Sequence, residues 1–436
     1  MNIDDHAPPI RHTLSSLMYV AKPIEMPERV VFINAGPIAH FASGDLHKPL
    51  TGHAMSSDEQ VYASGMGFII EEGVFSKILD SDEIIAEFGQ QNCVDLSGRA
   101  IVPGYVDSHS HLLWAGDRSG EMRLRQQGMS YAEIAAEGGG IKFTVDETRR
   151  CTDFDTISKD RMDLALSHGT TSIEVKSGYG LETSTELAML SSYQSIQNYR
   201  GMNVTPTWMG AHDYPTEMPR ADYFEQLMSD QLPAVIDQGI AEYVDVFCEP
   251  GWYTLEETEE ICREAMRHNL KVRLHVDEFT DGEGLQLAAE LRAITADHSI
   301  HSSDDARAKA SAAGVIQGFL PGTPYVMGSD KWPPIQKCID EDWAWAIATD
   351  YNPNCRSLSL PMAGSLITHR LGIDPLAALA AATRNPATGV TRADGLQQGV
   401  ITEGAVANFN QLKSEFIESW CQSPGHSGIE RTWLLK

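Results

Sequence analysis

Positive charge is scarce in this sequence. Lys and Arg number 33 against 61 Asp and Glu, and the formal net charge is -28. A surface of this sign repels the phosphates of nucleic acids and of anionic lipids. Long apolar runs are also absent, and the N-terminus lacks the cationic start and apolar core of a secretory signal. The sequence therefore predicts a cytoplasmic protein that binds neither nucleic acid nor a membrane.

Cysteine is infrequent as well, with seven residues scattered along the chain. They include no C-x-x-C pair, which argues against a disulfide framework and a structural zinc knuckle. No G-x-G-x-x-G pattern follows a predicted strand, and no fixed-period repeat is present. These absences argue against a dinucleotide-binding fold and against a repeat protein.

Both ends of the chain are rich in short β-type runs broken by glycine. Residues 1–98 contain RVVFINAG, MGFIIEEG and FSKILD, and residues 395–436 contain GLQQGVITEGAVANFNQL. This shared pattern of short β-type runs and glycines predicts one small β-sandwich domain built from both chain ends. Residues 99–394 would then form a second, larger domain.

Eight short apolar runs recur in the central part, and each closes on a polar group. From the second run onward they are separated by helix-compatible segments such as LEETEEICREAMRHN, whose apolar spacing buries one face. This alternation predicts an α/β fold with a parallel sheet, and eight such units match a (β/α)8 TIM-type barrel. A doubly wound open sheet is the alternative, and the longer gap at residues 112–170 must carry extra structure. The runs are GYVDSHSH, TTSIEVKSG, VTPTWMGAH, YVDVFCEPG, KVRLHVDE, ITADHSIH, VIQGFLPGT and WAIATDYN.

Two histidines close the first of these runs. Alternate side chains of a strand share a face, so His109 and His111 project to the same side at the barrel mouth, where sites of this fold lie. His275 and Asp350 end the fifth and eighth runs, which a closed barrel brings back towards the first. Three imidazoles and a carboxylate, without a thiolate, suit one Zn²⁺ or iron ion (Fe²⁺ or Fe³⁺) with water in the open position.

Two further residues have competing interpretations. His298 closes the sixth run and could orient the water beside the metal, or it could be a core histidine satisfied by hydrogen bonds. Lys176 in EVKSG could bridge two metals if it were carboxylated, but a solvated or ion-paired lysine is the favoured interpretation. One metal ion per chain is therefore expected.

A series of longer motifs extends this pattern in a fixed order: HSHLLWAGDR, SYAEIAAEGGGI, EVKSGYGL, GAH, VFCEPG, RLHVDEF, ADH, LPGT and ATDYNP. In this order they resemble the imidazolonepropionases of the amidohydrolase superfamily, and they cover nearly the whole barrel. The resemblance implies a metal-dependent hydrolase that opens 4-imidazolone-5-propanoate to N-formimino-L-glutamate in histidine degradation. It also implies a homodimer.

The resemblance further implies roles for individual residues. The metal ligands would be the three histidines and Asp350 named above, in agreement with the spacing argument. Glu278, three residues after His275, would be the acid/base carboxylate. The residues that would contact the substrate are Arg118, Tyr131, Tyr179, His212, Glu278 and Asn352.

The chemistry requires such groups independently. Hydrolysis of a cyclic amide needs an activated water, whose proton Asp350 can accept. His212 or His298 can donate to the tetrahedral intermediate, and Glu278 can carry a proton to the departing nitrogen. Arg118 offers a bidentate cation for a propionate, unless it is a surface arginine in an ion pair.

The segment after ATD departs from the family pattern. Asn354, Cys355 and Arg356 stand where the family has small residues that would cradle the substrate carboxylate. Arg356 could replace the missing donors and Asn354 could shorten the pocket, or Arg356 could point to solvent. The expected substrate is a five-membered ring that bears a carboxylate. Because of this departure, its tail or ring substituent stays open.

Other functions fit parts of the pattern. A related amidohydrolase could act on another imidazolone-like or hydantoin-like ring that bears a carboxylate. An aminohydrolase, such as a purine or pyrimidine deaminase, also uses one metal with an H-x-x-E pair, but Arg118 favours an acidic substrate. A barrel that binds a ligand without catalysis is disfavoured by the presence of all four ligands and Glu278.

Overall fold

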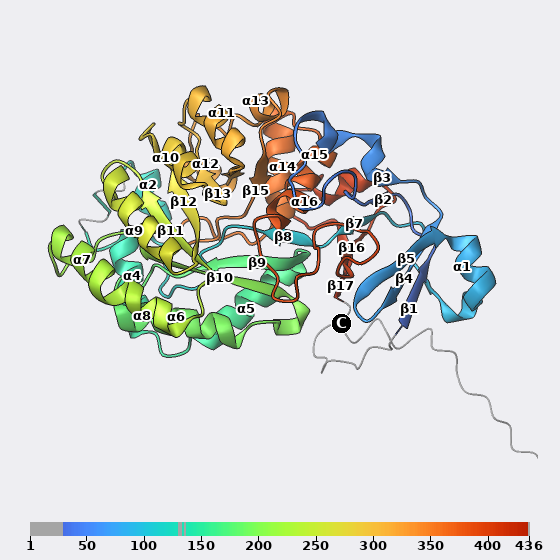
Figure 1. Cartoon of the computed structure of the whole chain (residues 1–436), viewed down its shortest axis with the longest axis horizontal. Helices are drawn as coiled ribbons and strands as arrows, with labels where there is room; N and C mark the ends of the chain where they lie inside the picture. The colour runs from blue at the N-terminus through green and yellow to red at the C-terminus, as the bar shows by residue number, and fades with distance from the viewer. Residues whose placement is uncertain (1–28, 130–132, 135–136, 435–436) are drawn as a thin grey trace, which may run out of the picture.

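The computed structural model describes residues 29–129, 133–134 and 137–434. Its largest element is a parallel sheet of eight strands, in which each strand lies beside its neighbours in chain order. Figure 1 shows helices arranged around this sheet. The strands, which match the eight predicted runs, are β8 (Tyr105–Asp107), β9 (Thr170–Lys176), β10 (Asn203–Ala211), β11 (Tyr243–Cys248), β12 (Lys271–Val276), β13 (Thr295–His298), β14 (Ile316–Phe319) and β15 (Trp345–Ile347).

Hydrogen bonds made just beyond the end of β15 connect the last strand of the sheet to the first. The Asp107 carboxylate accepts from the Thr349 backbone at 3.0 Å and from the Thr349 hydroxyl at 2.6 Å. Just beyond, the backbone N–H of Asp350 donates to the carbonyl of His109 at 3.0 Å. The predicted (β/α)8 barrel is thus confirmed, and the open doubly wound sheet is excluded.

Helices cover the outside of the barrel and begin where the sequence supplies caps. In α9 (Leu255–Arg267), the Thr254 hydroxyl accepts from the Glu257 backbone, and the Glu257 carboxylate accepts from the Thr254 backbone. Ile261 and Ala265 lie on the buried face of α9. The other helices around the barrel are α5 (Phe154–Ser167), α6 (Thr183–Ser195), α7 (Arg220–Gln226), α8 (Leu232–Gln238), α10 (Gly284–Leu291), α11 (Asp304–Ala313), α12 (Gly322–Met327), α13 (Ile335–Asp340), α14 (Leu360–Leu371), α15 (Pro375–Ala380) and α16 (Arg384–Ala387).

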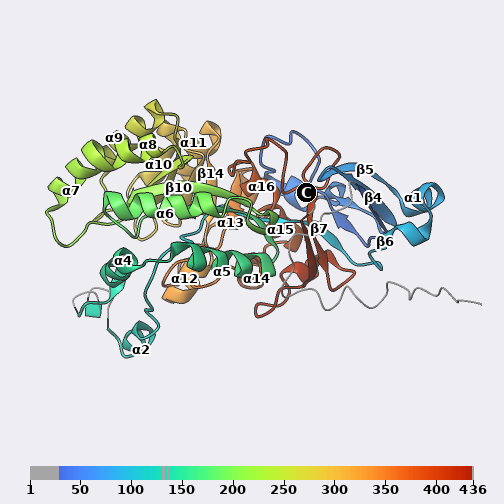
Figure 2. The same cartoon turned by 90° about the horizontal axis from the view of Figure 1, so that it is seen from below.

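The long segment between β8 and β9 carries additional helices, as predicted. The helices α2 (Glu121–Gln126) and α4 (Gly140–Arg150) precede α5, and Figure 2 shows them on one side of the barrel. The Glu121 carboxylate accepts a hydrogen bond from the Gly140 backbone at 2.8 Å. This bond ties the start of α2 to the start of α4.

Two smaller sheets are present, one made of N-terminal strands alone and one that combines strands from both ends of the chain. One contains, in order, β5 (Val74–Asp80), β4 (Met66–Glu71), β1 (Arg29–Ile33) and β6 (Val94–Asp95), and the other contains β17 (Ile429–Leu434), β16 (Asn408–Leu412), β7 (Ile101–Pro103), β2 (Ile38–Ala39) and β3 (Val61–Tyr62). Aromatic rings join the two sheets, since Phe409 lies 5.4 Å from Phe32 and 5.0 Å from Phe68, centre to centre. Helix α1 (Ser81–Phe88) packs on β1 and β4 (Figure 1). The β-sandwich is therefore present, whereas the boundaries drawn after residues 98 and 394 stay a prediction.

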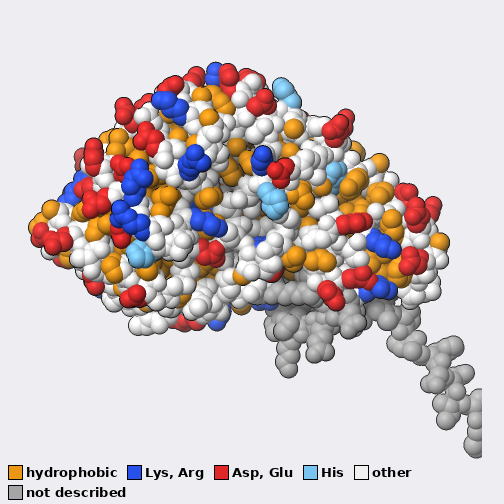
Figure 3. Space-filling view, viewed as in Figure 1, with side chains coloured by type: hydrophobic (Ala, Val, Ile, Leu, Met, Phe, Trp, Pro, Cys, Tyr) orange, Lys and Arg blue, Asp and Glu red, His pale blue; other side chains and the backbone are white. Residues whose placement is uncertain are grey.

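The surface carries charges of both signs. Figure 3 shows Asp and Glu side chains scattered over one face, with Lys and Arg among them. Some form ion pairs, such as Arg263 and Glu259 on α9 at 2.6 Å. Among the described residues, no helix has the length and apolar character needed to cross a membrane.

Candidate active site

Three histidines and an aspartate meet at the carboxyl-terminal ends of the strands. His109 and His111 follow β8, His275 lies on β12, and Asp350 follows β15; none of them is more than 3% exposed. Nε2 of His111 lies 3.3 Å from Nε2 of His275. Oδ1 of Asp350 lies 3.6 Å from Nε2 of His109 and 3.7 Å from Nε2 of His111. The structure thus brings the four predicted ligands together in one buried cluster.

This set of donor atoms fits one divalent metal ion. Two ligand atoms that each lie about 2.1 Å from one metal ion, at an angle of roughly 90–120°, are about 3.0–3.6 Å apart, close to the separations in the cluster. Nε2 of His109 is buried and has no hydrogen-bond partner among the described residues. Burial holds the pKa values of His109 and His111 well below their usual range, so both rings are neutral and offer lone pairs.

Two aspartates that the sequence analysis did not single out orient these histidines. Asp297 on β13 accepts a hydrogen bond from Nδ1 of His109 at 2.7 Å, and Asp245 on β11 accepts one from Nδ1 of His275 at 2.9 Å. With its proton on Nδ1, each ring aims the Nε2 lone pair into the cluster. The sequence did contain a signal for both residues. Each is an acidic residue inside a predicted apolar strand, in TADH and in YVDVFC, and a buried acidic residue needs a partner.

Asp297→Asn is expected to weaken metal binding by about 10- to 100-fold, because an amide accepts less strongly than a carboxylate from His109. Competition with a chelator measures this affinity, and thermal unfolding shows whether the variant is folded. Asp237→Asn, at an exposed position of α8, is the matched control and should bind metal like the parent. A folded Asp297→Asn protein with parental affinity would contradict the orienting role.

A buried lysine balances these carboxylates. Nζ of Lys176 lies 2.7 Å from Asp245 and 3.0 Å from Glu174. Burial alone would lower the pKa of Lys176, but the two carboxylates outweigh it and raise that pKa. The ion-paired interpretation of Lys176 is therefore confirmed. Ion pairs and hydrogen bonds also account for the neighbouring group of His109, Asp245 and Asp297 without a second metal ion.

Asp350 is held from several sides. Its backbone has a φ of 48°, which is uncommon for a residue other than glycine. The Thr323 hydroxyl donates a short hydrogen bond to Oδ2, and Nδ2 of Asn352 donates to the Asp350 carbonyl at 2.8 Å. Burial raises the pKa of Asp350, and the Thr323 hydrogen bond opposes this rise. One carboxylate oxygen therefore faces the histidines while the other is anchored.

His298 and Glu278 lie beside the cluster. The ring nitrogens of His298 come within 4.8 Å of those of His109 and His275, and Nε2 of His298 lies 3.6 Å from the Glu278 carboxylate. Burial raises the pKa of Glu278 well above its usual range, and two nearby carboxylates raise it further. Burial also keeps the pKa of His298 low. These two shifts favour the uncharged forms of the Glu278 carboxyl group and of the His298 ring.

His212 and Tyr179 pack against His111. The His212 ring is stacked on His111 at 4.9 Å, and the Tyr179 ring meets the edge of His212 at 5.0 Å. Nδ1 of His212 donates to the Gly178 carbonyl at 2.9 Å, and burial lowers the pKa of His212 to about 4. A neutral ring with its proton on Nδ1 presents Nε2 as an acceptor. His212 is thus suited to accept a hydrogen bond, whereas the sequence analysis considered it as a donor.

The two arginines predicted to bind a carboxylate have different surroundings. Arg118 is buried, and its Nε and Nη2 each lie 2.9 Å from the Glu121 carboxylate. The Arg356 side chain is 49% exposed and lies 3.2 Å from the exposed Asp117 carboxylate, with its guanidinium 5.3 Å from the Trp114 ring. Arg118 is therefore a fixed, buried cation, and Arg356 lies at the surface.

Asn352 shapes the loop that follows Asp350. Its side-chain oxygen accepts from the backbone of Asn354 at 2.8 Å and of Cys355 at 3.0 Å. Asn354 itself is partly buried. The substrate contacts expected for Asn352 and Asn354 stay a prediction, and Tyr131 lies outside the described residues.

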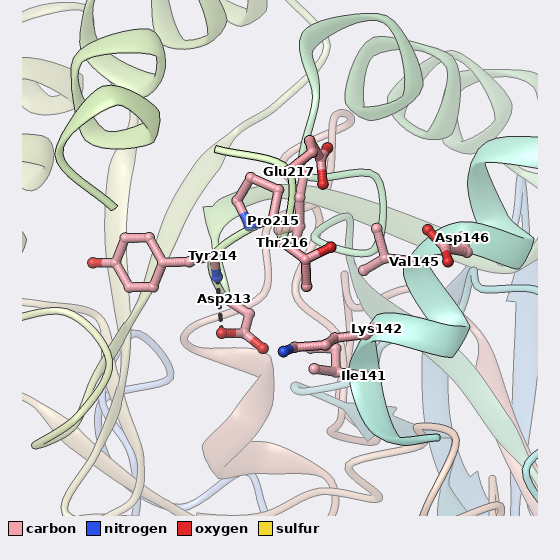
Figure 4. A pocket seen from close by; sticks show the side chains of 10 residues that line it. Ile141, Lys142, Val145, Asp146, Asp213, Tyr214, Pro215, Thr216 and Glu217 are labelled. Atoms are coloured by element: carbon pink, nitrogen blue, oxygen red, sulfur yellow. Dashed lines mark hydrogen bonds between the residues drawn. The ribbon is translucent and has the colours of Figure 1, made fainter. Parts of the chain in front are cut away.

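A small pocket is lined in part by Asp213, the residue after His212. It is lined by α4 and by residues 213–217, and Figure 4 shows Lys142 and Asp213 extending towards each other across it. Its volume of about 10 Å³ accommodates roughly one water molecule. Burial raises the pKa of Asp213, and the charge of Lys142 partly offsets this rise. The pocket is therefore too small for a substrate.

Comparison with known proteins identifies the family. No protein-family model matches the chain. The curated imidazolonepropionases of Haloarcula marismortui and Symbiobacterium thermophilum are 38% and 37% identical to it, over 79% and 84% of this chain and 83% and 86% of their own. The chain belongs to the imidazolonepropionase family. It is accordingly a hydrolase that acts on carbon–nitrogen bonds of cyclic amides.

Solved structures share the fold of this imidazolonepropionase-family chain. Guanine deaminase of E. coli has a TM-score of 0.63 at 13% identity and covers 94% of this chain and 98% of its own. A mutant of atrazine chlorohydrolase from Arthrobacter aurescens, complexed with zinc and atraton, has a TM-score of 0.62 at 15% identity and covers 92% of each chain. At these identities the likeness establishes the fold alone.

Proposed function

We propose that this protein adds water to 4-imidazolone-5-propanoate and opens its ring to N-formimino-L-glutamate, a step of histidine degradation. The water oxygen joins the ring carbonyl carbon, the ring carbon–nitrogen bond breaks, and the nitrogen takes up a proton. The observation that carries this proposal is the convergence of four buried ligand atoms, two of them aimed by Asp297 and Asp245. The identity to curated imidazolonepropionases supports the choice of substrate.

One divalent metal ion would be held by His109, His111, His275 and Asp350. Three ring nitrogens and one carboxylate oxygen suit Zn²⁺ and iron, with one position open. When bound, such an ion supplies a Lewis acid that lowers the pKa of water and polarises a carbonyl. The chain's own carboxylates and imidazoles supply the remaining chemistry.

Asp350 would accept the proton of the attacking water. Its Oδ1 lies on the histidine side, and the Thr323 hydroxyl holds Oδ2. A general base must be held within hydrogen-bonding reach of the proton that it takes. The hydrogen bond from Thr323 restricts rotation of the carboxylate and so preserves this position.

Glu278 would deliver a proton to the departing ring nitrogen. Its raised pKa favours the protonated form of the carboxyl group, which a general acid requires. His298, whose Nε2 lies 3.6 Å away, would orient this carboxyl group. A leaving nitrogen that is protonated as its bond breaks departs uncharged, as part of the formimino group of the product.

His212 would orient the substrate ring. Its Nδ1 is engaged by Gly178, so its Nε2 can accept a hydrogen bond from a ring N–H. Tyr179 packs on the edges of His212 and His111 and restrains both rings. This arrangement favours a substrate that has an N–H group next to its reacting carbonyl.

Arg118 would bind the propanoate tail. Glu121 engages its Nε and Nη2 and also accepts from the Gly140 backbone, so the guanidinium is held in one orientation. The loop built by Asn352 and Asn354 would close the tail end of the site. Arg356 is exposed and would contribute little, because exposed ion pairs are weak.

Arg118→Ala should raise KM for the acid by about 10- to 100-fold, the usual worth of hydrogen bonds to a charged group. Arg356→Ala, the matched variant, should change KM by less than about 3-fold. Steady-state kinetics on the acid and on its uncharged amide measure both effects. If both variants kept the parental preference for the acid, neither arginine would bind the carboxylate.

An aminohydrolase reaction is the second candidate. The spacing of His275 and Glu278, together with the fold shared with guanine deaminase, favours it. Loss of the ultraviolet band of freshly generated imidazolone propanoate, with formiminoglutamate as product, would support ring opening. Release of ammonia from an intact ring would instead support the deaminase.

The same proposal includes a homodimer in the cytoplasm, without a nucleic-acid partner. The resemblance of the sequence motifs to this family implies the dimer, and the net charge of -28 disfavours a nucleic-acid partner. Light scattering of the purified protein measures its mass in solution. A mass near twice 47.9 kDa is expected.

A further inference from the structure

Glu249 holds the backbone segment that carries Glu278. It directly follows β11 and is 1% exposed. Its Oε2 accepts a hydrogen bond from the backbone of Glu278 at 2.8 Å. Its Oε1 accepts from the backbones of Phe279 and Thr280 at 3.1 and 3.0 Å. One carboxylate thus connects the loop after β11 to three consecutive N–H groups of the loop after β12.

The Glu249 carboxylate is held by backbone N–H groups. No Lys or Arg forms an ion pair with it in the part of the chain that the structure describes. Burial raises the pKa of Glu249, and the backbone hydrogen bonds from residues 278–280 oppose that rise. Converging backbone N–H groups stabilise a buried anion through their dipoles. Residues 278–280 and the Glu249 charge therefore hold each other in place.

The far end of the same loop has a separate anchor. Asp277 has a φ of 51°, and its Oδ1 accepts from the backbones of Gly282 and Gly284 at 3.1 and 3.0 Å. These bonds fix the entry into α10 but do not engage the N–H groups of residues 278–280. Within the described chain, those three N–H groups depend on Glu249.

The Glu278 side chain has little direct restraint beyond the neighbouring His298 ring. Its carboxyl group forms no hydrogen bond to another described residue, and Nε2 of His298 lies 3.6 Å from it. The position of this carboxyl group is therefore set mainly by its backbone. Displacing a proton donor by about 1 Å greatly slows proton transfer. The backbone anchor of Glu278 therefore affects the rate of the reaction.

We propose that Glu249 is a positioning residue that fixes Glu278 for proton transfer. This inference rests on the proposed function, in which Glu278 protonates the departing nitrogen. Loss of the anchor would let residues 278–280 adopt several conformations. Proton transfer would then slow, while the tail of the substrate would still bind to Arg118.

Glu249→Gln tests the anchor, because its NH₂ group would oppose one of the backbone N–H groups. Its kcat should fall by about 10- to 100-fold with KM within about 3-fold of the parent. Glu260→Gln, at an exposed position of α9, is the matched control and should leave both constants unchanged. If the Gln variant does not fold, Glu249→Asp keeps the charge but shortens its reach and should lower kcat in the same way.

A double-mutant cycle separates positioning from general damage to the fold. Adding Glu249→Gln to Glu278→Gln should lower kcat by less than about 3-fold further, because the first residue acts through the second. Full additivity of the two losses would overturn the proposal. So would a Glu249→Gln protein whose kcat equals that of the parent.

Hydrogen exchange provides a measurement that does not depend on activity. Amides 278–280 should exchange faster in Glu249→Gln than in the parent, while amides of β11 exchange as before. Unchanged exchange at residues 278–280 would overturn the anchor whatever the kinetics show. If the parent protein did not turn over imidazolone propanoate, the proposed function would be wrong. The exchange measurement would still test the anchor independently of that result.

Discussion

Asp350→Asn is expected to lower kcat by about 10⁴-fold or more, because the variant loses the acceptor for the proton of the attacking water. The amide retains an oxygen that can face His109 and His111, and it can still bond to Thr323. The barrel should therefore stay folded. Steady-state kinetics on imidazolone propanoate, with thermal unfolding and metal analysis of the same sample, measure the effect.

The exposed Asp237→Asn variant serves as the control for this loss of one carboxylate. Its activity and stability should match those of the parent. Activity near the parental level in Asp350→Asn would exclude Asp350 as the base. Loss of metal from that variant would show that ligation, and not only proton transfer, had been removed.

Glu278→Gln should lower kcat by about 10²- to 10⁴-fold, the usual contribution of a positioned general acid. The amide has nearly the same shape, but it cannot donate an acidic proton to the departing nitrogen. Metal content and KM should stay close to those of the parent. The exposed Glu260→Gln variant is the control, and loss of metal from Glu278→Gln would make Glu278 a ligand.

The pH dependence of kcat offers a further check on Glu278. Burial raises its pKa above the usual range, and the charges of Asp350 and Glu249 raise it further. A general acid acts in its protonated form, so kcat should fall as pH rises through this raised pKa. This fall in kcat at high pH should be absent in Glu278→Gln. If the fall were unchanged in the variant, it would arise from the titration of another group.

Most of the barrel could be predicted from the sequence because its strands are local features. Runs such as TTSIEVKSG and YVDVFCEPG are apolar, short and closed by polar residues, as strands buried on both faces must be. The spacing of His109 and His111 placed both rings on one side of a strand. Closure of the barrel then brought His275 and Asp350 to them, without any further assumption.

Contacts between distant segments could not be predicted in this way. His109 and Asp297 are separated by 188 residues, and no local pattern pairs them. The pairing of Arg118 with Glu121, and the surface position of Arg356 beside Asp117, depend on how loops fold back on the barrel. Loop arginines can adopt many directions, so side-chain type alone does not determine what they bind.

Titration of Zn²⁺ or Fe²⁺ into chelator-treated protein, with formiminoglutamate quantified at each point, tests the central claim most directly. A single site made by His109, His111, His275 and Asp350 predicts no product without metal. Product formation should then rise linearly and level off at one equivalent per chain. A break at two equivalents, or full activity in the metal-free protein, would contradict the account.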